Sequence, residues 1–220
     1  DWEDIEKNIG SSAHKRAARK VAAESITLVK DESSMIPIKP EKINKLSHII
    51  LSVDDGAKDY LEILSKDINR TVNNADNIFI NYELDDYLID KIIDRTSESD
   101  VIVVSSLVRI RMDKGISTLD SSHFKFLNKL KAKAKAPILF ISFGSPYVDS
   151  YDSFDAYIAT YGYGSISIKA VANAIFGREN ISGRLPIDLN EKYKKGTGLK
   201  RSKRTSEFKK KVRLTIWSLL

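Results

Sequence analysis

Cysteine is absent from this chain of 220 residues. Its absence excludes disulfide bonds, thiolate zinc sites and cysteine nucleophiles, and it leaves the cellular compartment open. No window approaches the roughly 18 uninterrupted apolar residues of a transmembrane helix, so we expect no membrane span. Histidine is scarce, and His14, His48 and His123 lack the spacing of metal ligands. We interpret each as a helix-surface or strand-end residue and expect neither a metal nor a cofactor.

Positive charge is concentrated near the end of the chain. The net charge is +6, yet residues 192–213 alone hold eleven Lys and Arg against one acid, Glu207. The rest of the chain is mildly acidic, with a net charge of −4. A nucleic-acid-binding domain normally carries its basic surface on the folded body. We therefore expect no nucleic-acid partner, and binding through the basic tail is the weakest of the alternatives.

The composition is typical of a globular protein, with 42% hydrophobic and 30% charged residues. The length suits one domain. We expect an amphipathic helix in residues 1–25, packed closely on a flat surface, a domain in residues 26–199 and a basic tail in residues 200–220. The chain begins at Asp1 with no leader. We interpret it as a fragment, or as a periplasmic or secreted protein if a leader has been removed.

Apolar runs alternate with helical stretches along the central part of the chain. The runs lie at residues 49–53, 78–80, 101–104, 138–143 and 156–160. The helical stretches lie near residues 57–68, 85–94, 124–133 and 165–175. Near-continuous apolar strands indicate a parallel sheet that is covered on both faces. We predict an α/β fold: a mostly parallel, doubly wound, Rossmann-like sheet of five to six strands with helices on both faces.

Finer expectations concern the two ends of this sheet. Residues 26–29 and 35–38 are short β-rich runs, and the proline in the second run suits an edge or a non-ladder position. Residues 183–189 predict a short returning strand. Ser165 is expected to cap the last helix, and Gly177 to adopt the left-handed conformation that ends it.

Three familiar constellations fail on their residues. Gly144-Ser145 follows a strand, but a nucleophile elbow needs glycine two residues on either side of the serine. Gly162-Tyr-Gly164 lacks the third glycine of a dinucleotide-binding loop, and a tight turn with a helix cap is favoured instead. Asp54-Asp55 resembles the acidic pair of a phospho-receiver, but Ser105-Ser106 stands where such a domain needs an aspartate.

Two arginines are more informative. Arg109 and Arg111 follow the third apolar run, at the carboxyl end of a predicted central strand. Ligands of open α/β sheets bind at that edge. A solvated loop or a salt bridge between domains explains the same residues, and both interpretations stay open.

Several segments, taken in order, resemble the second domain of family 3 glycoside hydrolases. They are an alanine-rich helix and strand at residues 18–30 with Ile-Pro-Ile at 36–38, a strand at 99–104, Phe-Gly-Ser-Pro-Tyr at 143–147, Ala-Ile-Phe-Gly at 174–177, Ile-Ser-Gly-Arg-Leu-Pro at 181–186 and Gly-Thr-Gly-Leu at 196–199. The first and last of these motifs are specific. The resemblance covers residues 13–199 and rests mainly on the shared order.

The resemblance implies a catalytic (β/α)₈ barrel that precedes this domain and carries the nucleophile. A barrel takes about 250 residues, so this chain has no room for one. The resemblance therefore implies that residues 1–25 lead in from a missing barrel domain, that the barrel and a carbohydrate substrate are the partners, and that this chain alone is inactive. We expect residues 200–220 to be a linker or the truncated start of another domain. An independent sugar- or nucleotide-binding module without catalysis is the alternative.

One difference from the family pattern indicates which branch of the family the sequence resembles. β-Glucosidase members carry a glutamate acid/base in this domain, whereas residues 108–123 hold no glutamate. Asp113 is a poor replacement, because a carboxyl group with an ordinary pKa of about 4 seldom donates a proton at neutral pH. The sequence is similar to the β-N-acetylglucosaminidase branch, which keeps its acid/base in the barrel. We expect no catalytic residue here, and name Arg109, Arg111, Ser145 and Tyr147 as candidate contacts with barrel or sugar.

Overall fold

The computed structural model describes residues 9–52, 56–109, 119–148 and 150–204. These residues form a six-stranded sheet in the order β1-β6-β5-β4-β2-β3. Its strands are β1 (Thr27–Asp31), β2 (Leu46–Leu51), β3 (Ala75–Ile80), β4 (Val101–Val108), β5 (Ile138–Gly144) and β6 (Ala156–Ala159). The α-helices are α2 (Ser12–Ser25), α3 (Ala57–Thr71), α4 (Asp86–Thr96), α5 (Ser121–Lys133) and α6 (Ser165–Ile175). Two short 3₁₀ turns, η1 (Pro40–Lys42) and η3 (Tyr151–Ser153), lie in loops.

The sheet confirms the predicted α/β class. Strands β2 to β6 pair in parallel, and β1 joins β6 in the antiparallel sense. Counted from β2, the parallel strands follow the order 2-1-3-4-5, which is a doubly wound arrangement with its switch point between β2 and β4. The carboxyl ends of these five strands consequently meet at one edge of the sheet.

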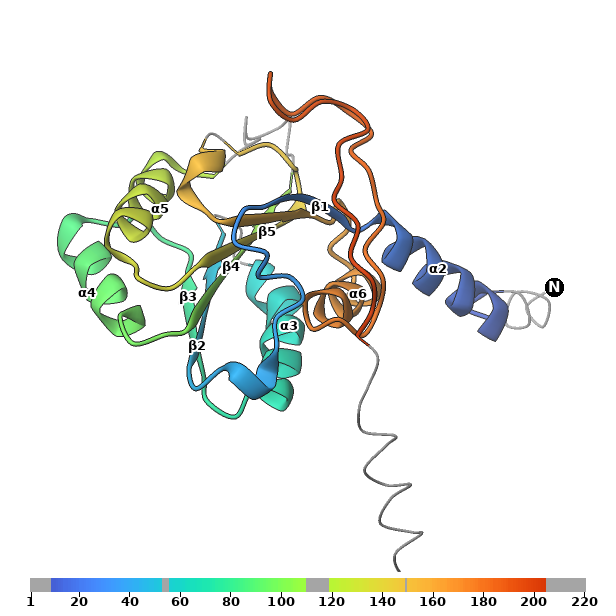
Figure 1. Cartoon of the computed structure of the whole chain (residues 1–220), viewed down its shortest axis with the longest axis horizontal. Coiled ribbons are helices and arrows are strands. Elements are labelled where there is room, and N and C mark those ends of the chain that lie inside the picture. Colours follow the sequence, from blue (N-terminus) through green and yellow to red (C-terminus); the bar gives the residue numbers. More distant parts are fainter. Residues whose placement is uncertain (1–8, 53–55, 110–118, 149, 205–220) are drawn as a thin grey trace, which may run out of the picture.

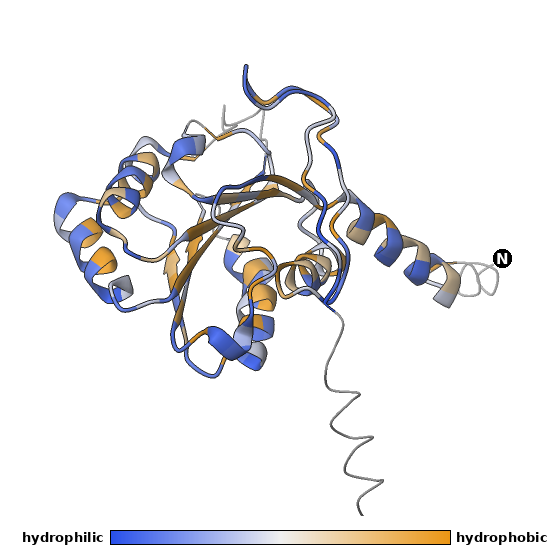
Figure 2. Cartoon of the chain, viewed as in Figure 1, coloured by the Kyte–Doolittle hydropathy of each residue, from blue (hydrophilic) through white to orange (hydrophobic). Residues whose placement is uncertain are grey.

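Alternating strand residues feed two separate cores. Val101, Val103 and Leu139 belong to one core with residues of α3 and α6, whereas Ile102, Val104 and Phe140 belong to the other with residues of α4 and α5. Helices α3 and α6 thus cover one face and α4 and α5 the opposite face (Figure 1). Colouring by hydropathy shows apolar residues along the strands and on the helix sides that face them (Figure 2). Burial on both faces explains why the strands read as continuous apolar runs.

Several helix ends follow the predicted chemistry. The carboxylate of Asp85 accepts a hydrogen bond from the Leu88 amide at 2.8 Å, and so begins α4. Gly177 has φ +69°, which confirms the left-handed end of α6. The expectation for Ser165 was wrong. Gly164 occupies the N-cap and offers no side-chain bond, so Ser165 is the first residue of α6.

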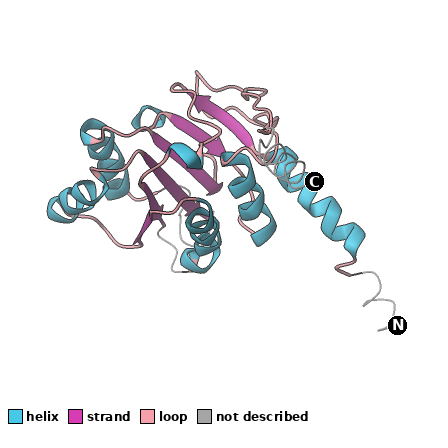
Figure 3. Cartoon of the chain, turned by 60° about the horizontal axis from the view of Figure 1, so that its bottom comes forward, coloured by secondary structure: helices cyan, strands magenta, loops and turns pink. Residues whose placement is uncertain are grey.

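Two other expectations need correction. Residues 183–189 are not a strand, because their backbone bonds to segments outside the sheet ladders. Residues 35–38 also lie outside the ladders, a position that suits the proline in this run. Ile38, for example, donates to the carbonyl of Ile175 at 2.7 Å. Helix α2 does not pack closely along its length: Ala22 is its one buried residue, and the helix extends away from the sheet (Figure 3).

The final described segment secures the outer edge of β1. The amide of Leu199 donates to the carbonyl of Leu28 at 2.8 Å. The Asp31 side chain, which is fully buried, accepts from Arg201 at 2.6 Å and from the Met35 amide at 2.9 Å. Residues 199–204 therefore fold onto the body of the domain.

His48 joins four elements inside the sheet. It is buried on β2, and its Nδ1 lies 3.0 Å from the hydroxyl of Ser65 on α3 and 3.3 Å from Oδ1 of Asn77 on β3. Its Nε2 lies 2.7 Å from the hydroxyl of Ser105 on β4. Asn77 Oδ1 can only accept, so Nδ1 carries the proton and Nε2 accepts from Ser105. Burial lowers the pKa of His48 from 6.5 to about 4, and the ring is neutral near pH 7.

This pKa predicts a stability that declines in mild acid. Below pH 6.5 the unfolded chain takes up a proton that the folded protein refuses until about pH 4, so the free energy of unfolding falls through that window. From pH 7 to pH 5 we expect His48 to account for a loss of about 2 kcal/mol, measured by urea unfolding of wild type and His48→Gln. The variant should lack this part of the slope, while His14→Gln on exposed α2 should keep it. Parallel losses in wild type and His48→Gln would contradict the assignment.

The buried Asp31 predicts a second stability effect. Asp31→Ala removes the partner of Arg201 and leaves a buried amide unpaired, so we expect a loss of about 3 kcal/mol in urea unfolding. Glu191→Ala breaks only an exposed pair with Lys194 and should change stability by less than about 0.5 kcal/mol. A loss below about 1 kcal/mol for Asp31→Ala would show that residues 199–204 do not depend on this contact.

Candidate functional site

Two loops meet at the carboxyl edge of β4 and β5. Arg109 directly follows β4, and Ser145 and Tyr147 follow β5. The Ser145 amide donates to the Val108 carbonyl at 3.0 Å, so the two loops are in contact at their origins. Arg111 lies outside the described residues. Three of the four residues predicted from the sequence are thus neighbours at one edge of the sheet.

Arg109 stands beside the switch point between β2 and β4. Its side chain is partly exposed and is not free of partners. On the adjacent strand, the Ser52 hydroxyl donates to the Leu107 carbonyl at 2.8 Å, which joins the ends of β2 and β4. Crevices at such switch points are where open α/β sheets bind ligands. Asp54 and Asp55 follow Ser52 and lie outside the described residues.

Gly144 brings the two loops together. Its φ is +81°, and a Cβ placed on it would lie 2.4 Å from the Val108 carbonyl oxygen. Only glycine allows this backbone conformation and this approach without strain. The Phe-Gly-Ser-Pro-Tyr motif is therefore a turn whose glycine fixes the exit of β5.

Ser145 and Tyr147 differ in accessibility. Ser145 is buried, and its hydroxyl lies 3.4 Å from the Tyr147 amide, which donates to it. Tyr147 is 43% exposed and is the accessible member of the pair. The geometry gives Ser145 a part in shaping the turn, and Tyr147 the surface for a contact.

Sequence reasoning missed Tyr82, which follows β3 at the same edge and is 48% exposed. Its carbonyl lies 3.2 Å from Nε2 of His123 on α5. Nδ1 of His123 is buried and has no hydrogen-bond partner, and burial lowers the pKa of this ring. The available signal in the sequence was a tyrosine two residues after an apolar run. Of the described residues, no three His, Cys, Asp or Glu side chains gather closely enough to hold a metal ion.

Buried tyrosine hydroxyls support the turn after β5. Tyr157 on β6 donates to the Pro146 carbonyl at 2.5 Å and contacts the Ser142 hydroxyl at 2.9 Å. Burial raises the pKa of Tyr157, so its hydroxyl stays protonated and able to donate. The candidate site is thus the turn at residues 144–147, whose backbone is bonded to a buried tyrosine hydroxyl and whose Tyr147 side chain is exposed.

The strand order and the exits of the strands together define a doubly wound α/β domain. The chain belongs to the glycosyl hydrolase family 3 C-terminal domain family, whose model matches residues 10–214. Among the described residues, none of the helices has the length and apolar character needed to cross a membrane.

One curated relative and many solved structures are similar to the chain, and the structures share its fold. A periplasmic beta-glucosidase of Salmonella typhimurium is 25% identical over an alignment of 229 residues that covers 84% of this chain and 30% of that protein. A beta-glucosidase from Listeria innocua, solved with isofagomine, has a TM-score of 0.67 at 15% identity over 84% of this chain and 28% of its own. A fungal multi-domain GH3 beta-N-acetylglucosaminidase has a TM-score of 0.64 at 21% identity over 84% and 20%. The chain therefore spans under a third of the length of these relatives.

Gly144→Ala tests the contact between the two loops. The added Cβ meets backbone at a conformation that L-residues avoid, so we expect a loss of about 2 kcal/mol or more in urea unfolding. Gly164→Ala is a matched control, because its φ is −67° and a Cβ there meets no heavy atom within 4 Å. Equal stability of the two variants would show that the turn does not require glycine at position 144.

Proposed function

We propose that this domain is the accessory, non-nucleophile part of a glycoside hydrolase that removes β-linked N-acetylglucosamine or related sugars. The family match over residues 10–214 carries the proposal. In it, the domain packs beside a catalytic (β/α)₈ barrel that these 220 residues do not contain, and residues 1–25 connect the two. A periplasmic or secreted location agrees with the name of the Salmonella relative, a periplasmic beta-glucosidase.

The choice of sugar rests on the segment after β4. Retaining glycosidases need a nucleophile and an acid/base about 5–5.5 Å apart. Residues 108–123 hold no glutamate, so in this proposal both reacting groups belong to the barrel. The fungal relative is named for N-acetylglucosamine, whereas the other two are named beta-glucosidases, and a β-glucoside is therefore the competing substrate.

The domain shapes the substrate site through its carboxyl edge. Arg109, Arg111 and Tyr147 contact the barrel or the sugar, and Ser145 holds the turn that presents Tyr147. An independent sugar- or nucleotide-binding module is the second candidate, favoured by the position of Arg109 beside the switch point. It predicts that the chain alone binds a ligand measurably, whereas an accessory domain binds little until the barrel is present.

Removing both arginine charges tests this assignment. In a polypeptide that holds barrel and domain, Arg109→Met with Arg111→Met should raise KM about tenfold or lower the melting temperature of the pair of domains. Arg70→Met, on exposed α3, is the control for general charge loss. Unchanged kinetics and melting would remove both arginines from the site.

A further inference from the structure

The backbone on both sides of Tyr147 is held by buried side chains. Tyr147 is 43% exposed, yet its neighbours Pro146 and Val148 both bond to tyrosine hydroxyls beneath them. Along the chain, the buried Ser145 precedes Pro146, and the exposed Tyr147 follows it. An accessible aromatic side chain on a fixed backbone is the usual form of a binding contact.

Tyr157 makes the strongest of these contacts. Its hydroxyl has one proton, which it donates to the Pro146 carbonyl at 2.5 Å. It then accepts the proton of Ser142, whose hydroxyl lies 2.9 Å away on β5. Because Tyr157 and Ser142 belong to neighbouring strands, the sheet itself fixes the position of Pro146.

Tyr151 adds weaker contacts from the 3₁₀ turn η3. Its hydroxyl lies 3.4 Å from the Pro146 carbonyl and 3.4 Å from the Val148 amide, which donates to it. Its ring packs edge-on against that of Tyr157, with 5.5 Å between the centroids. Both amide bonds that flank Tyr147 are therefore tied to these two rings.

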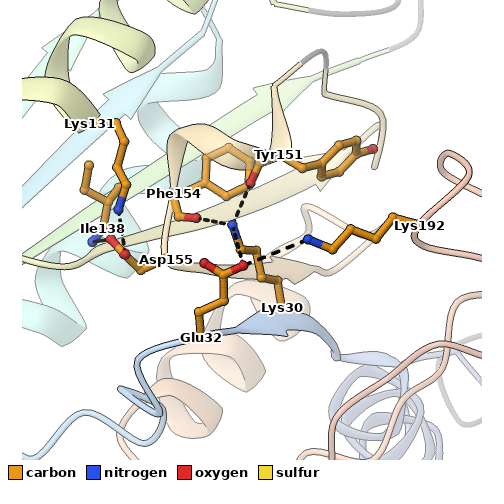
Figure 4. A network of polar contacts seen from close by, with 8 residues as sticks. All are labelled: Lys30, Glu32, Lys131, Ile138, Tyr151, Phe154, Asp155 and Lys192. Carbon is orange, nitrogen blue, oxygen red and sulfur yellow. Dashed lines mark hydrogen bonds and ion pairs between the residues drawn. The ribbon is translucent and has the colours of Figure 1, made fainter.

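The far end of the same loop is fixed independently. The buried Lys30 ammonium on β1 donates to the carbonyls of Tyr151 at 3.1 Å and Phe154 at 2.8 Å (Figure 4). Asp155 accepts from Lys131 at 2.6 Å and from the Ile138 amide at 2.9 Å. Tyr151 is consequently held at its carbonyl while its hydroxyl supports the turn.

We propose that Tyr157 and Tyr151 are positioning residues that hold Tyr147 as a preorganised platform for one pyranose ring of the substrate. The inference rests on the proposed function for its occupant, but the rigidity of the turn stands on the contacts alone. An aromatic side chain on a fixed backbone loses less conformational entropy when it stacks on a ligand than one on a mobile loop. Tyr157 acts through Tyr147 and does not itself touch the sugar.

Backbone order at Tyr147 and Val148 measures the proposal directly. In the 220-residue chain we expect amide order parameters near 0.85 at both positions by ¹⁵N relaxation, falling below about 0.6 in Tyr157→Phe. Tyr193→Phe is the matched control. Tyr193 lies in the same aromatic cluster, with 5.4 Å between its ring centroid and that of Tyr151, and the bonds to Pro146 and Val148 come from Tyr151 and Tyr157 instead. Unchanged order in Tyr157→Phe would overturn the proposal.

A milder change keeps the test valid if Tyr157→Phe fails to fold. Ser142→Ala removes the hydroxyl that donates to Tyr157. The Tyr157 hydroxyl then keeps its bond to the Pro146 carbonyl but loses the contact with β5 that helps to orient it. We expect an intermediate drop in order at Tyr147 and Val148. Order equal to that of wild type would count against the proposal.

Kinetics separate this inference from the proposed function. In a polypeptide with its barrel, Tyr157→Phe should raise KM for a chromogenic β-N-acetylglucosaminide about two- to tenfold at unchanged kcat. Suppose that Tyr147→Ala raises KM, but that Tyr157→Phe leaves KM unchanged even though its turn is mobile. The positioning role of Tyr157 is then refuted, while the contact between Tyr147 and the sugar is supported. If Tyr147→Ala leaves KM unchanged, the platform has no sugar to hold and its function is refuted, even where the order parameters agree.

Discussion

Parallel pairing of β2, β4, β5 and β6 is the constraint on which the other features of this domain depend. Because these strands run the same way and are buried on both faces, each must be followed by a crossover, and every strand exit lies at one edge. Arg109 and the Gly144–Tyr147 turn therefore lie at the same edge although they are far apart in the sequence. His48 adds a polar bond across the same strands, at the cost of acid sensitivity.

A second constraint is the closure of the sheet at β1. This strand pairs with β6 in the antiparallel sense, and the segment that follows α6 pairs with its outer edge at Leu28 and Leu199. The ion pair between Asp31 and Arg201 holds that segment against β1. Lys30, which precedes Asp31, donates to a carbonyl in the loop between β5 and β6. The edge strand thus links the end of the described chain with the loop that presents Tyr147.

Much of the fold was predictable because its signals are local. Continuous apolar runs identified β2, β4 and β5, and Gly177 marked the end of α6. The short strand at 183–189 was wrong because a β-rich composition cannot tell a ladder strand from an irregular segment whose backbone bonds to other loops. For the site, the strand-exit rule predicted that Arg109 lies at the carboxyl edge of the sheet, and the turn motif singled out Ser145. Neither signal could show that Ser145 is buried, that Tyr82 is exposed, or that Tyr157 supports Pro146, since these depend on contacts between distant residues.

The central claim is that this family 3 domain supports chemistry that takes place on another domain. The chain alone, purified and incubated with a chromogenic β-N-acetylglucosaminide and with the matching β-glucoside, tests it most directly. The account predicts no turnover of either substrate, because the nucleophile belongs to the barrel. Turnover that persists through purification would place a complete active site within these 220 residues and contradict the account.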